Sequence, residues 1–319
     1  MKIVFLDSAT MGSDIGRQKI ISGYKDFGEV FIYENTKPTQ IAERIKDAYI
    51  VITNKCRLNA DTLEAAKNLK LICVCATGYD NIDIKYCGIN NIAVCNISGY
   101  STDSVAQVTV SMVLALICRL RPYNRYVHSG TYAASGNPNC LLPVYNEISA
   151  MKWGIVGLGA IGKKVANVAE ALGAEVVVHT RNDSCGYKQL ELDELCRVSD
   201  IISLHVPLND ETRHMINAER LGMMKKNAVL INVARGAVVD EAAVTEAVIT
   251  GGISGIGVDV YDGEPIARNS PYRSLYGMDN VIFTPHMAWG SYESRIRCLD
   301  IVRENIKSFL NGDNKNRIV

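Results

Sequence analysis

The sequence has no surplus of charge of either sign and no block of like charges. Its 319 residues include 34 Lys and Arg and 34 Asp and Glu, so the formal net charge at pH 7 is zero. Binding to nucleic-acid phosphates needs a surplus of Lys and Arg. The composition therefore argues against a nucleic-acid partner.

The chain also lacks a hydrophobic run that could span a bilayer. Its longest apolar stretch, residues 105–118, is interrupted by Gln107, Thr109 and Ser111 and is shorter than the ~20 residues that a transmembrane helix needs. The N-terminal MKIVFLDS reaches an aspartate too soon for a signal peptide. We therefore expect a cytoplasmic protein without a membrane partner.

None of the ten cysteines has the CxxC spacing that is typical of metal and redox sites. Cys73, Cys75 and Cys95 lie inside expected strands. The pattern indicates reduced, buried cysteines, and it predicts no metal site.

What the sequence does contain is an alternation of short β-rich runs and longer amphipathic stretches. Strands are expected first at 3–6, 30–33, 49–53, 71–75 and 93–96, with helices such as 39–46 and 61–68 between them, and then at 153–156, 175–179, 201–205, 228–233, 257–260 and 281–284. Runs that are apolar on both faces are typical of parallel sheets covered by helices. The length favours two domains. The prediction is thus an α/β protein with two doubly wound parallel sheets.

Two helices connect these series. One long helix is expected at 101–120, carrying the chain into the second domain, and an amphipathic helix at 291–310 is expected to pack back on the first. The predicted domains are therefore 1–99 with 289–319, and 100–288.

The sharpest local signal is GLGAIG at 157–162, which follows an expected strand and opens an expected helix. In a dinucleotide-binding loop, Gly157 would permit the tight turn, Gly159 would let the backbone approach the pyrophosphate, and Gly162 would allow close packing of helix and sheet. The helix N-terminus would then meet the phosphates. We predict a nicotinamide dinucleotide site here.

The end of the next strand bears on the choice of cofactor. NAD-binding versions carry an acid there for the ribose 2′-hydroxyl, whereas this chain has Thr180 and Arg181. A guanidinium beside a hydroxyl suits a 2′-phosphate. NADP(H) is therefore the favoured cofactor, with NAD(H) as the alternative if Asp183 reaches the ribose.

Four motifs in order resemble the D-isomer-specific 2-hydroxyacid dehydrogenases: the glycine loop, NVARG at 232–236, DVYDGEP at 259–265 and TPH at 284–286. ATGYDNID at 76–83 extends the resemblance into the first domain. VITNK at 51–55 and PHMAW at 285–289 look most like the glycerate dehydrogenase (hydroxypyruvate reductase) branch. Thr180 departs from the family's commoner aspartate.

The resemblance implies a Rossmann cofactor domain inserted into a flavodoxin-like substrate domain, and a homodimer built from the cofactor domains. It implies that the backbone near Thr77 and Gly78 binds the substrate carboxylate. Predicted cofactor contacts beyond the loop glycines, Thr180 and Arg181 are Ala160, Ile161, Pro207, Thr212, Val233, Ala234 and Asp259.

Three residues are predicted to carry the chemistry, and each follows a different expected strand. Arg235 would bind the substrate carboxylate and polarise the ketone. His286 would donate a proton to the ketone oxygen, and Glu264 would orient its imidazole. Because ligands of open α/β sheets bind at the carboxyl ends of the strands, these positions favour one site.

The predicted function is hydride transfer between NAD(P)H and a small 2-oxo acid, with hydroxypyruvate and glyoxylate as the leading substrates. D-lactate or larger D-2-hydroxy acids are alternatives. A nucleotide-sensing binding protein that resembles a co-repressor is another, although the absence of extra tails or a basic patch favours the enzyme.

Overall fold

The computed structural model describes residues 1–181 and 186–319, which form two compact units. Unit 1 comprises Met1–Ser101 with Gly290–Val319, and unit 2 comprises Thr102–Trp289. The predicted boundaries lie within two residues of these limits. Each unit is built on one parallel sheet with helices on both faces, which confirms the predicted fold class.

Unit 1 contains a five-stranded parallel sheet with the order β2-β1-β3-β4-β5, the order of flavodoxin-like folds. Its strands are β1 (Lys2–Phe5), β2 (Glu29–Ile32), β3 (Ile50–Thr53), β4 (Leu71–Val74) and β5 (Ala93–Cys95). All residues of β3 and β4 are buried, as expected for central strands covered on both faces.

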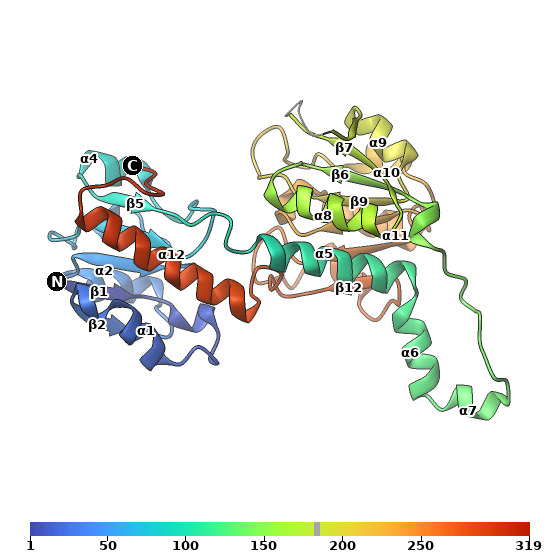
Figure 1. The fold of residues 1–319 in the computed structure, drawn as a ribbon, viewed down its shortest axis with the longest axis horizontal. Helices are drawn as coiled ribbons and strands as arrows, with labels where there is room; N and C mark the ends of the chain where they lie inside the picture. Colours follow the sequence, from blue (N-terminus) through green and yellow to red (C-terminus); the bar gives the residue numbers. More distant parts are fainter. Residues whose placement is uncertain (182–185) are drawn as a thin grey trace. The chain divides into compact units, whose positions relative to one another are not determined.

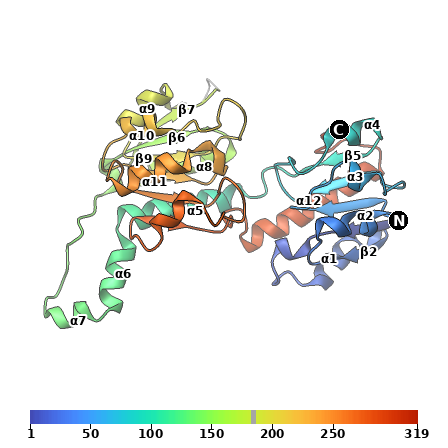
Figure 2. The ribbon, with the colours of Figure 1, turned by 180° about the vertical axis from the view of Figure 1, so that it is seen from behind.

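Helices cover both faces of this sheet (Figures 1 and 2). One face carries α1 (Arg17–Tyr24) and α12 (Tyr292–Leu310), and the other carries α2 (Ile41–Ile45), α3 (Ala60–Leu63) and α4 (Ile84–Ile89). Unit 1 also contains the short 3-10 helices η1 (Ser8–Met11), η2 (Lys25–Phe27) and η3 (Pro38–Gln40). The C-terminal helix packs on the first domain as predicted, with Tyr24 Oη donating to the Leu299 carbonyl at 3.0 Å. The helices predicted at 39–46 and 61–68 are shorter than expected.

Unit 2 contains a seven-stranded parallel sheet with the order β12-β11-β10-β9-β6-β7-β8. Its strands are β6 (Lys152–Val156), β7 (Glu175–His179), β8 (Lys188–Gln189), β9 (Ile201–Leu204), β10 (Val229–Asn232), β11 (Gly255–Val258) and β12 (Val281–Phe283). Six match predicted strands, and the order is that of a dinucleotide-binding sheet extended by β12. Strand β8 was not predicted, because this edge strand has only two residues and both are exposed.

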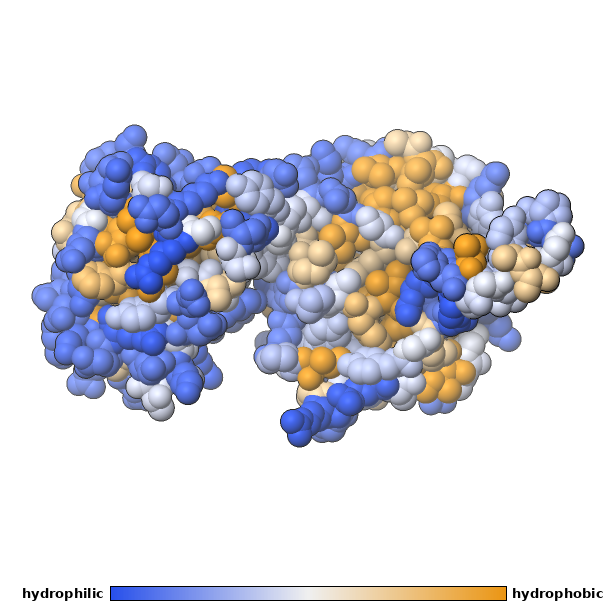
Figure 3. Space-filling model, turned by 90° about the horizontal axis from the view of Figure 1, so that it is seen from below, coloured by the Kyte–Doolittle hydropathy of each residue, from blue (hydrophilic) through white to orange (hydrophobic). Residues whose placement is uncertain are grey.

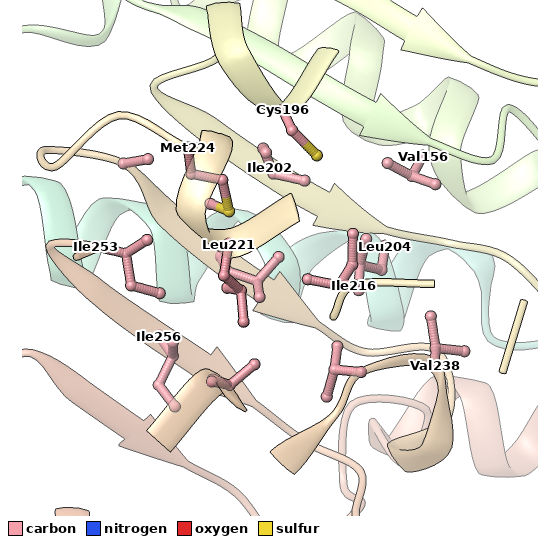
Figure 4. Packing of buried hydrophobic residues seen from close by; sticks show 14 of the residues in the cluster. Val156, Cys196, Ile202, Leu204, Ile216, Leu221, Met224, Val238, Ile253 and Ile256 are labelled. Carbon is pink, nitrogen blue, oxygen red and sulfur yellow. The ribbon is translucent and has the colours of Figure 1, made fainter. Parts of the chain in front are cut away.

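Alternating side chains of these strands supply two hydrophobic cores. Trp153 and Ile155 face α5 (Thr102–Ile117) and α8 (Ala160–Ala171), whereas Val156, Ile202 and Leu204 face the opposite cluster, shown in Figure 4. The helices of that opposite face are α9 (Leu192–Val198), α10 (Ala218–Met223) and α11 (Glu241–Ile249), and the 3-10 helices of the unit are η4 (Ile148–Ala150), η5 (Gly236–Val238) and η6 (Pro271–Leu275). Because both faces of the sheet are packed against helices, the strands are held in place. Ligands of such sheets bind at the carboxyl ends of the strands.

The helix predicted at 101–120 forms over 102–117 but does not continue to residue 120. Helix α5 ends at Ile117, Arg119 has the left-handed φ of 54°, and α6 (Leu120–His128) leaves at an angle of 63°. A side chain in this conformation breaks a regular helix. Residues 120–147, which include α7 (Thr131–Ser135) and are called the arm below, stand away from the body of unit 2 (Figure 1).

Within the described residues, no single helix is long and apolar enough to cross a membrane. The bent pair α5 and α6 meets the criteria of length and composition only when the two are joined.

Candidate active site

The phosphate loop has the geometry that its glycines predict. Gly157 has φ +94°, and a Cβ there would lie 2.6 Å from the His205 carbonyl oxygen. A Cβ on Gly162 would lie 2.1 Å from the Gly157 carbonyl oxygen. A Cβ on Gly159 would meet nothing within 4 Å, so space is open in front of this residue. Packing thus requires the outer two glycines, and the middle one leaves room for a ligand.

Helix α8 begins at Ala160, directly behind this open space. The first N–H groups of a helix have no partner within it, and with the helix dipole they favour an anion. Ala160 is exposed and Ile161 is half-buried, so the first turn is accessible. The loop and helix fit the pyrophosphate of a nicotinamide dinucleotide.

Two alanine substitutions separate packing from ligand binding in this loop. Gly162→Ala should lower the melting temperature, because its Cβ has no room. Gly159→Ala should leave the melting temperature within about 2 °C of wild type but weaken NADH binding at least about tenfold, because the methyl group would stand where the pyrophosphate approaches. Thermal denaturation and titration of NADH fluorescence measure the two effects. Unchanged NADH affinity in Gly159→Ala would contradict the assignment of the loop.

The loops that flank the phosphate loop carry the predicted adenosine contacts. Thr180 is half-buried and its carbonyl accepts from Gln189 Nε2 at 2.7 Å. Arg181 is exposed, and its Nη1 lies 3.2 Å from Glu211 Oε2. Asp183, the basis of the alternative reading, lies outside the described residues. The NADP preference therefore stays a prediction.

Thr212 and Pro207 belong to one tightly bonded loop after β9. The Thr212 hydroxyl donates to the Pro207 carbonyl at 2.7 Å, and Asn209 Oδ1 accepts from the N–H groups of Glu211 and Thr212, both at 3.0 Å. These bonds hold the loop in one conformation. The contacts of Pro207 and Thr212 with a cofactor remain predicted.

His205 is a neutral imidazole at the carboxyl end of β9. Burial lowers its pKa to about 3. Its Nε2 lies 3.0 Å from Ser203 Oγ, which also accepts from Trp153 Nε1 at 3.0 Å. The buried Nδ1 finds no hydrogen-bond partner among residues 1–181 and 186–319. His205 meets the phosphate loop through its backbone, because its carbonyl oxygen lies next to Gly157.

Arg235 follows β10, and Asn232 shapes the turn that presents it. The Asn232 carboxamide donates to the Arg235 carbonyl at 2.9 Å and accepts from the Ala234 N–H at 3.1 Å. A Cβ on Gly236 would lie 1.9 Å from the Tyr261 carbonyl carbon, so this turn presses against the loop after β11. The half-buried guanidinium donates to the Ala234 carbonyl at 2.8 Å. Val233 and Ala234 are buried in the same turn.

Asp259 organises the loop that carries His286. Its carboxylate accepts from the Thr284 hydroxyl at 2.5 Å and from the N–H groups of Met287 and Ala288 at 2.9 Å each. Burial raises the pKa of this carboxyl, and the hydrogen bonds oppose the shift. The carboxylate therefore holds the backbone of residues 287 and 288 in place, and its contact with the cofactor stays a prediction.

His286 and Glu264 form a close pair. His286 Nδ1 lies 2.5 Å from Glu264 Oε2, and Glu264 Oε1 accepts from the Tyr261 N–H at 3.2 Å. The two side chains are 26% and 32% exposed, so they are reachable from solvent. With Nδ1 donating to the carboxylate, Nε2 is the ring nitrogen that can exchange a proton with a ligand. His286 has a left-handed φ of 53°.

The three predicted catalytic residues follow neighbouring strands. Strands β10, β11 and β12 are adjacent and parallel, and the turns that carry Arg235, Glu264 and His286 all leave from their carboxyl ends. The structure thus brings the pair His286–Glu264 into hydrogen-bond contact and places Arg235 at the same edge of the sheet.

Thr77 and Gly78 lie in unit 1, after β4. The Thr77 carbonyl accepts from Asn96 Nδ2 at 2.8 Å. Across the described ranges, the N–H groups of Thr77 and Gly78 donate to no protein acceptor. Free amides suit a carboxylate, which supports the predicted role.

The sequence reasoning missed Asp7. This buried carboxylate follows β1 and accepts from the N–H groups of Asn54, Lys55 and Cys56 at 2.6–3.1 Å. It therefore holds the loop after β3 at the same edge of the sheet as Thr77. An acid that directly follows the apolar run of the first strand was the available signal.

Comparisons with known proteins agree with this geometry. Residues 110–288 match the family model described as D-isomer specific 2-hydroxyacid dehydrogenase, NAD binding domain. A hydroxypyruvate reductase of Blautia hydrogenotrophica is 35% identical, with 98% of each chain covered. A glycerate dehydrogenase of Methylorubrum extorquens is 37% identical over 99% of this chain and 98% of the relative. The crystal structure of D-lactate dehydrogenase from Aquifex aeolicus, complexed with NAD and lactic acid, superposes with a TM-score of 0.86 at 30% identity, covering 99% of each chain.

Proposed function

Because this chain belongs to the D-isomer specific 2-hydroxyacid dehydrogenase family, we propose that it reduces hydroxypyruvate or glyoxylate to the corresponding 2-hydroxy acid. The family consists of nicotinamide-dependent oxidoreductases that act on CH–OH groups. Relatives named hydroxypyruvate reductase and glycerate dehydrogenase support these substrates. The observation that carries the proposal is the pair His286–Glu264 beside the turn of Arg235.

Each side chain then has one task. A bound nicotinamide cofactor supplies the hydride that reaches C2 of the 2-oxo acid. The Arg235 guanidinium binds the carboxylate and polarises the ketone. Protonated His286 gives the proton on Nε2 to the ketone oxygen, so the C=O bond becomes a CH–OH group. Glu264 holds the imidazole through Nδ1 and stabilises its charged form.

The proposed cofactor preference is for NADPH. Thr180 and Arg181 stand where an acid would bind the ribose hydroxyls of NAD, and a guanidinium can form charge-assisted hydrogen bonds with a 2′-phosphate. The Arg181 side chain is 74% exposed, so it is accessible to a ligand from solvent.

One panel assay tests substrate and cofactor together. Oxidation of NADPH and NADH is followed with glyoxylate, hydroxypyruvate, pyruvate and larger 2-oxo acids. The highest kcat/KM is expected for hydroxypyruvate or glyoxylate with NADPH. A higher kcat/KM with NADH would reject the NADP preference alone, and no turnover of any 2-oxo acid would favour a nucleotide-binding role.

We also propose that the protein is a homodimer joined by unit 2. The arm supports this, because Leu141, Leu142 and Val144 are at least 65% exposed and no side chain of α6 or α7 is buried. Helix α5 adds Val108, Val110 and Leu114, which pack against the core of unit 2 but are only half-buried. Figure 3 shows hydrophobic side chains gathered on the face of unit 2 from which the arm projects. Two copies related by a twofold axis would cover such surfaces mutually.

Polar substitutions in the arm test this assembly. The double variant Leu141→Ser, Leu142→Ser should halve the mass measured by light scattering, because contact area of the dimer would be lost. Ile89→Ser, at an exposed apolar residue of unit 1, is the matched control and should leave the mass unchanged. A monomeric wild-type protein would contradict the proposal.

A further inference from the structure

The ion pair of Arg181 and Glu211 spans the start of the phosphate loop. Strand β6 lies between β7 and β9 in the sheet, and it leads directly into Gly157. Arg181 follows β7, whereas Glu211 lies in the loop after β9, and the two side chains meet at 3.2 Å. The pair therefore joins the loops on either side of the strand that carries the phosphate loop.

The backbone of Glu211 is fixed, whereas both side chains of the ion pair are exposed. The backbone of Glu211 is fixed by its N–H bond to Asn209 Oδ1, in the loop that Thr212 closes. The Arg181 and Glu211 side chains are 74% and 75% exposed. An ion pair this exposed to water contributes little and separates readily. A stronger anion that reached Arg181 could thus take the place of the Glu211 carboxylate.

We propose that Glu211 is a specificity-determining residue of the cofactor site, because its carboxylate competes with a ribose 2′-phosphate for Arg181. The inference rests on the proposed role of Arg181. A carboxylate beside the guanidinium occupies donors that a phosphate would use, and its charge repels the phosphate dianion. A nucleotide with a free 2′-hydroxyl brings no such charge. Glu211 therefore lowers the affinity for NADPH relative to NADH.

Direct binding measurements on the full chain test this inference. NADPH and NADH are titrated by nucleotide fluorescence into wild type, Glu211→Gln, Arg181→Gln and the double variant. Glu211→Gln should bind NADPH about tenfold more tightly, and NADH within about twofold of wild type, because one negative charge near the phosphate is removed. The neighbouring Asp210→Asn, which removes the same charge from the same loop, is the matched control and should change NADPH binding less than twofold.

The double variant separates competition for Arg181 from a general effect of charge. If Glu211 acts through Arg181, its substitution should give no gain in NADPH affinity when Arg181 is already glutamine. An equal gain in both backgrounds, an equal gain for NADH, or unchanged NADPH affinity in Glu211→Gln would each overturn the inference. A wild type that prefers NADH would reject the proposed cofactor preference, while the change between wild type and Glu211→Gln would still decide the role of Glu211.

Discussion

Substitution of His286 by alanine should lower kcat for 2-oxo acid reduction by about 10²–10⁴-fold, the usual contribution of a positioned general acid. In the structure, the imidazole is held through Nδ1 by Glu264 at 2.5 Å, which leaves Nε2 for the substrate. Steady-state kinetics with glyoxylate or hydroxypyruvate measures the loss. Binding of the reduced cofactor should be unchanged, because the phosphate loop is a separate part of unit 2.

A second variant of His286 is needed, because alanine could disturb the backbone as well as remove the imidazole. Its φ of 53° is disfavoured for alanine but tolerated by asparagine. His286→Asn should therefore keep the melting temperature and still lose kcat. His214→Asn is the matched control, because His214 is exposed and has a φ of 49°. Wild-type turnover in His286→Asn would reject His286 as the proton donor.

Glu264→Gln distinguishes a positioning role from a purely structural one. An amide can still contact Nδ1 but stabilises an imidazolium less than a carboxylate does. The pH above which reduction slows should therefore move downward, while a merely structural role would lower activity equally at all pH values. The comparison of pH profiles for kcat/KM decides between them.

Substitution of Arg235 by alanine should lower kcat/KM for 2-oxo acids by about 10²–10⁴-fold, since two charge-assisted hydrogen bonds to the carboxylate would be lost. The guanidinium contributes one hydrogen bond to this turn, to the Ala234 carbonyl, but Asn232 and the close packing at Gly236 remain, so the fold should persist. Arg235→Lys keeps the charge but not the planar fork, and it should recover only part of the activity.

Measurements of ligand binding show whether Arg235→Ala loses activity because it no longer binds the substrate carboxylate. Arg235→Ala should abolish measurable binding of oxamate, a 2-oxo acid analogue, to the complex with reduced cofactor, and leave the Kd of the cofactor unchanged. Arg197→Ala, at an exposed arginine of α9, should change neither. Wild-type oxamate affinity in Arg235→Ala would contradict the role of the guanidinium.

Much of unit 2 was predictable because its strands are apolar on both faces. Such runs are buried from either side, so hydrophobicity alone marks β6, β9 and β10. Strand β8 was not predictable, because its two exposed residues join the sheet through backbone pairing with β7, which no apolar pattern marks. The break of the predicted helix at Arg119 depends on one left-handed residue, which the apolar pattern on either side does not reveal.

For the site, the sequence by itself determined the glycine loop and the residue types after three strands: Arg235, Glu264 and His286. These depend on local order along the chain and on the rule that parallel strands bring their carboxyl ends to one edge. Only the tertiary structure decided the contacts between loops that are distant in sequence. Asp259 holds the segment of His286 across 25 or more residues, Asp7 binds a loop 47 residues away, and Glu211 meets Arg181. Hydrogen bonds of this kind depend on where the sheet places each loop, and no local pattern encodes that placement.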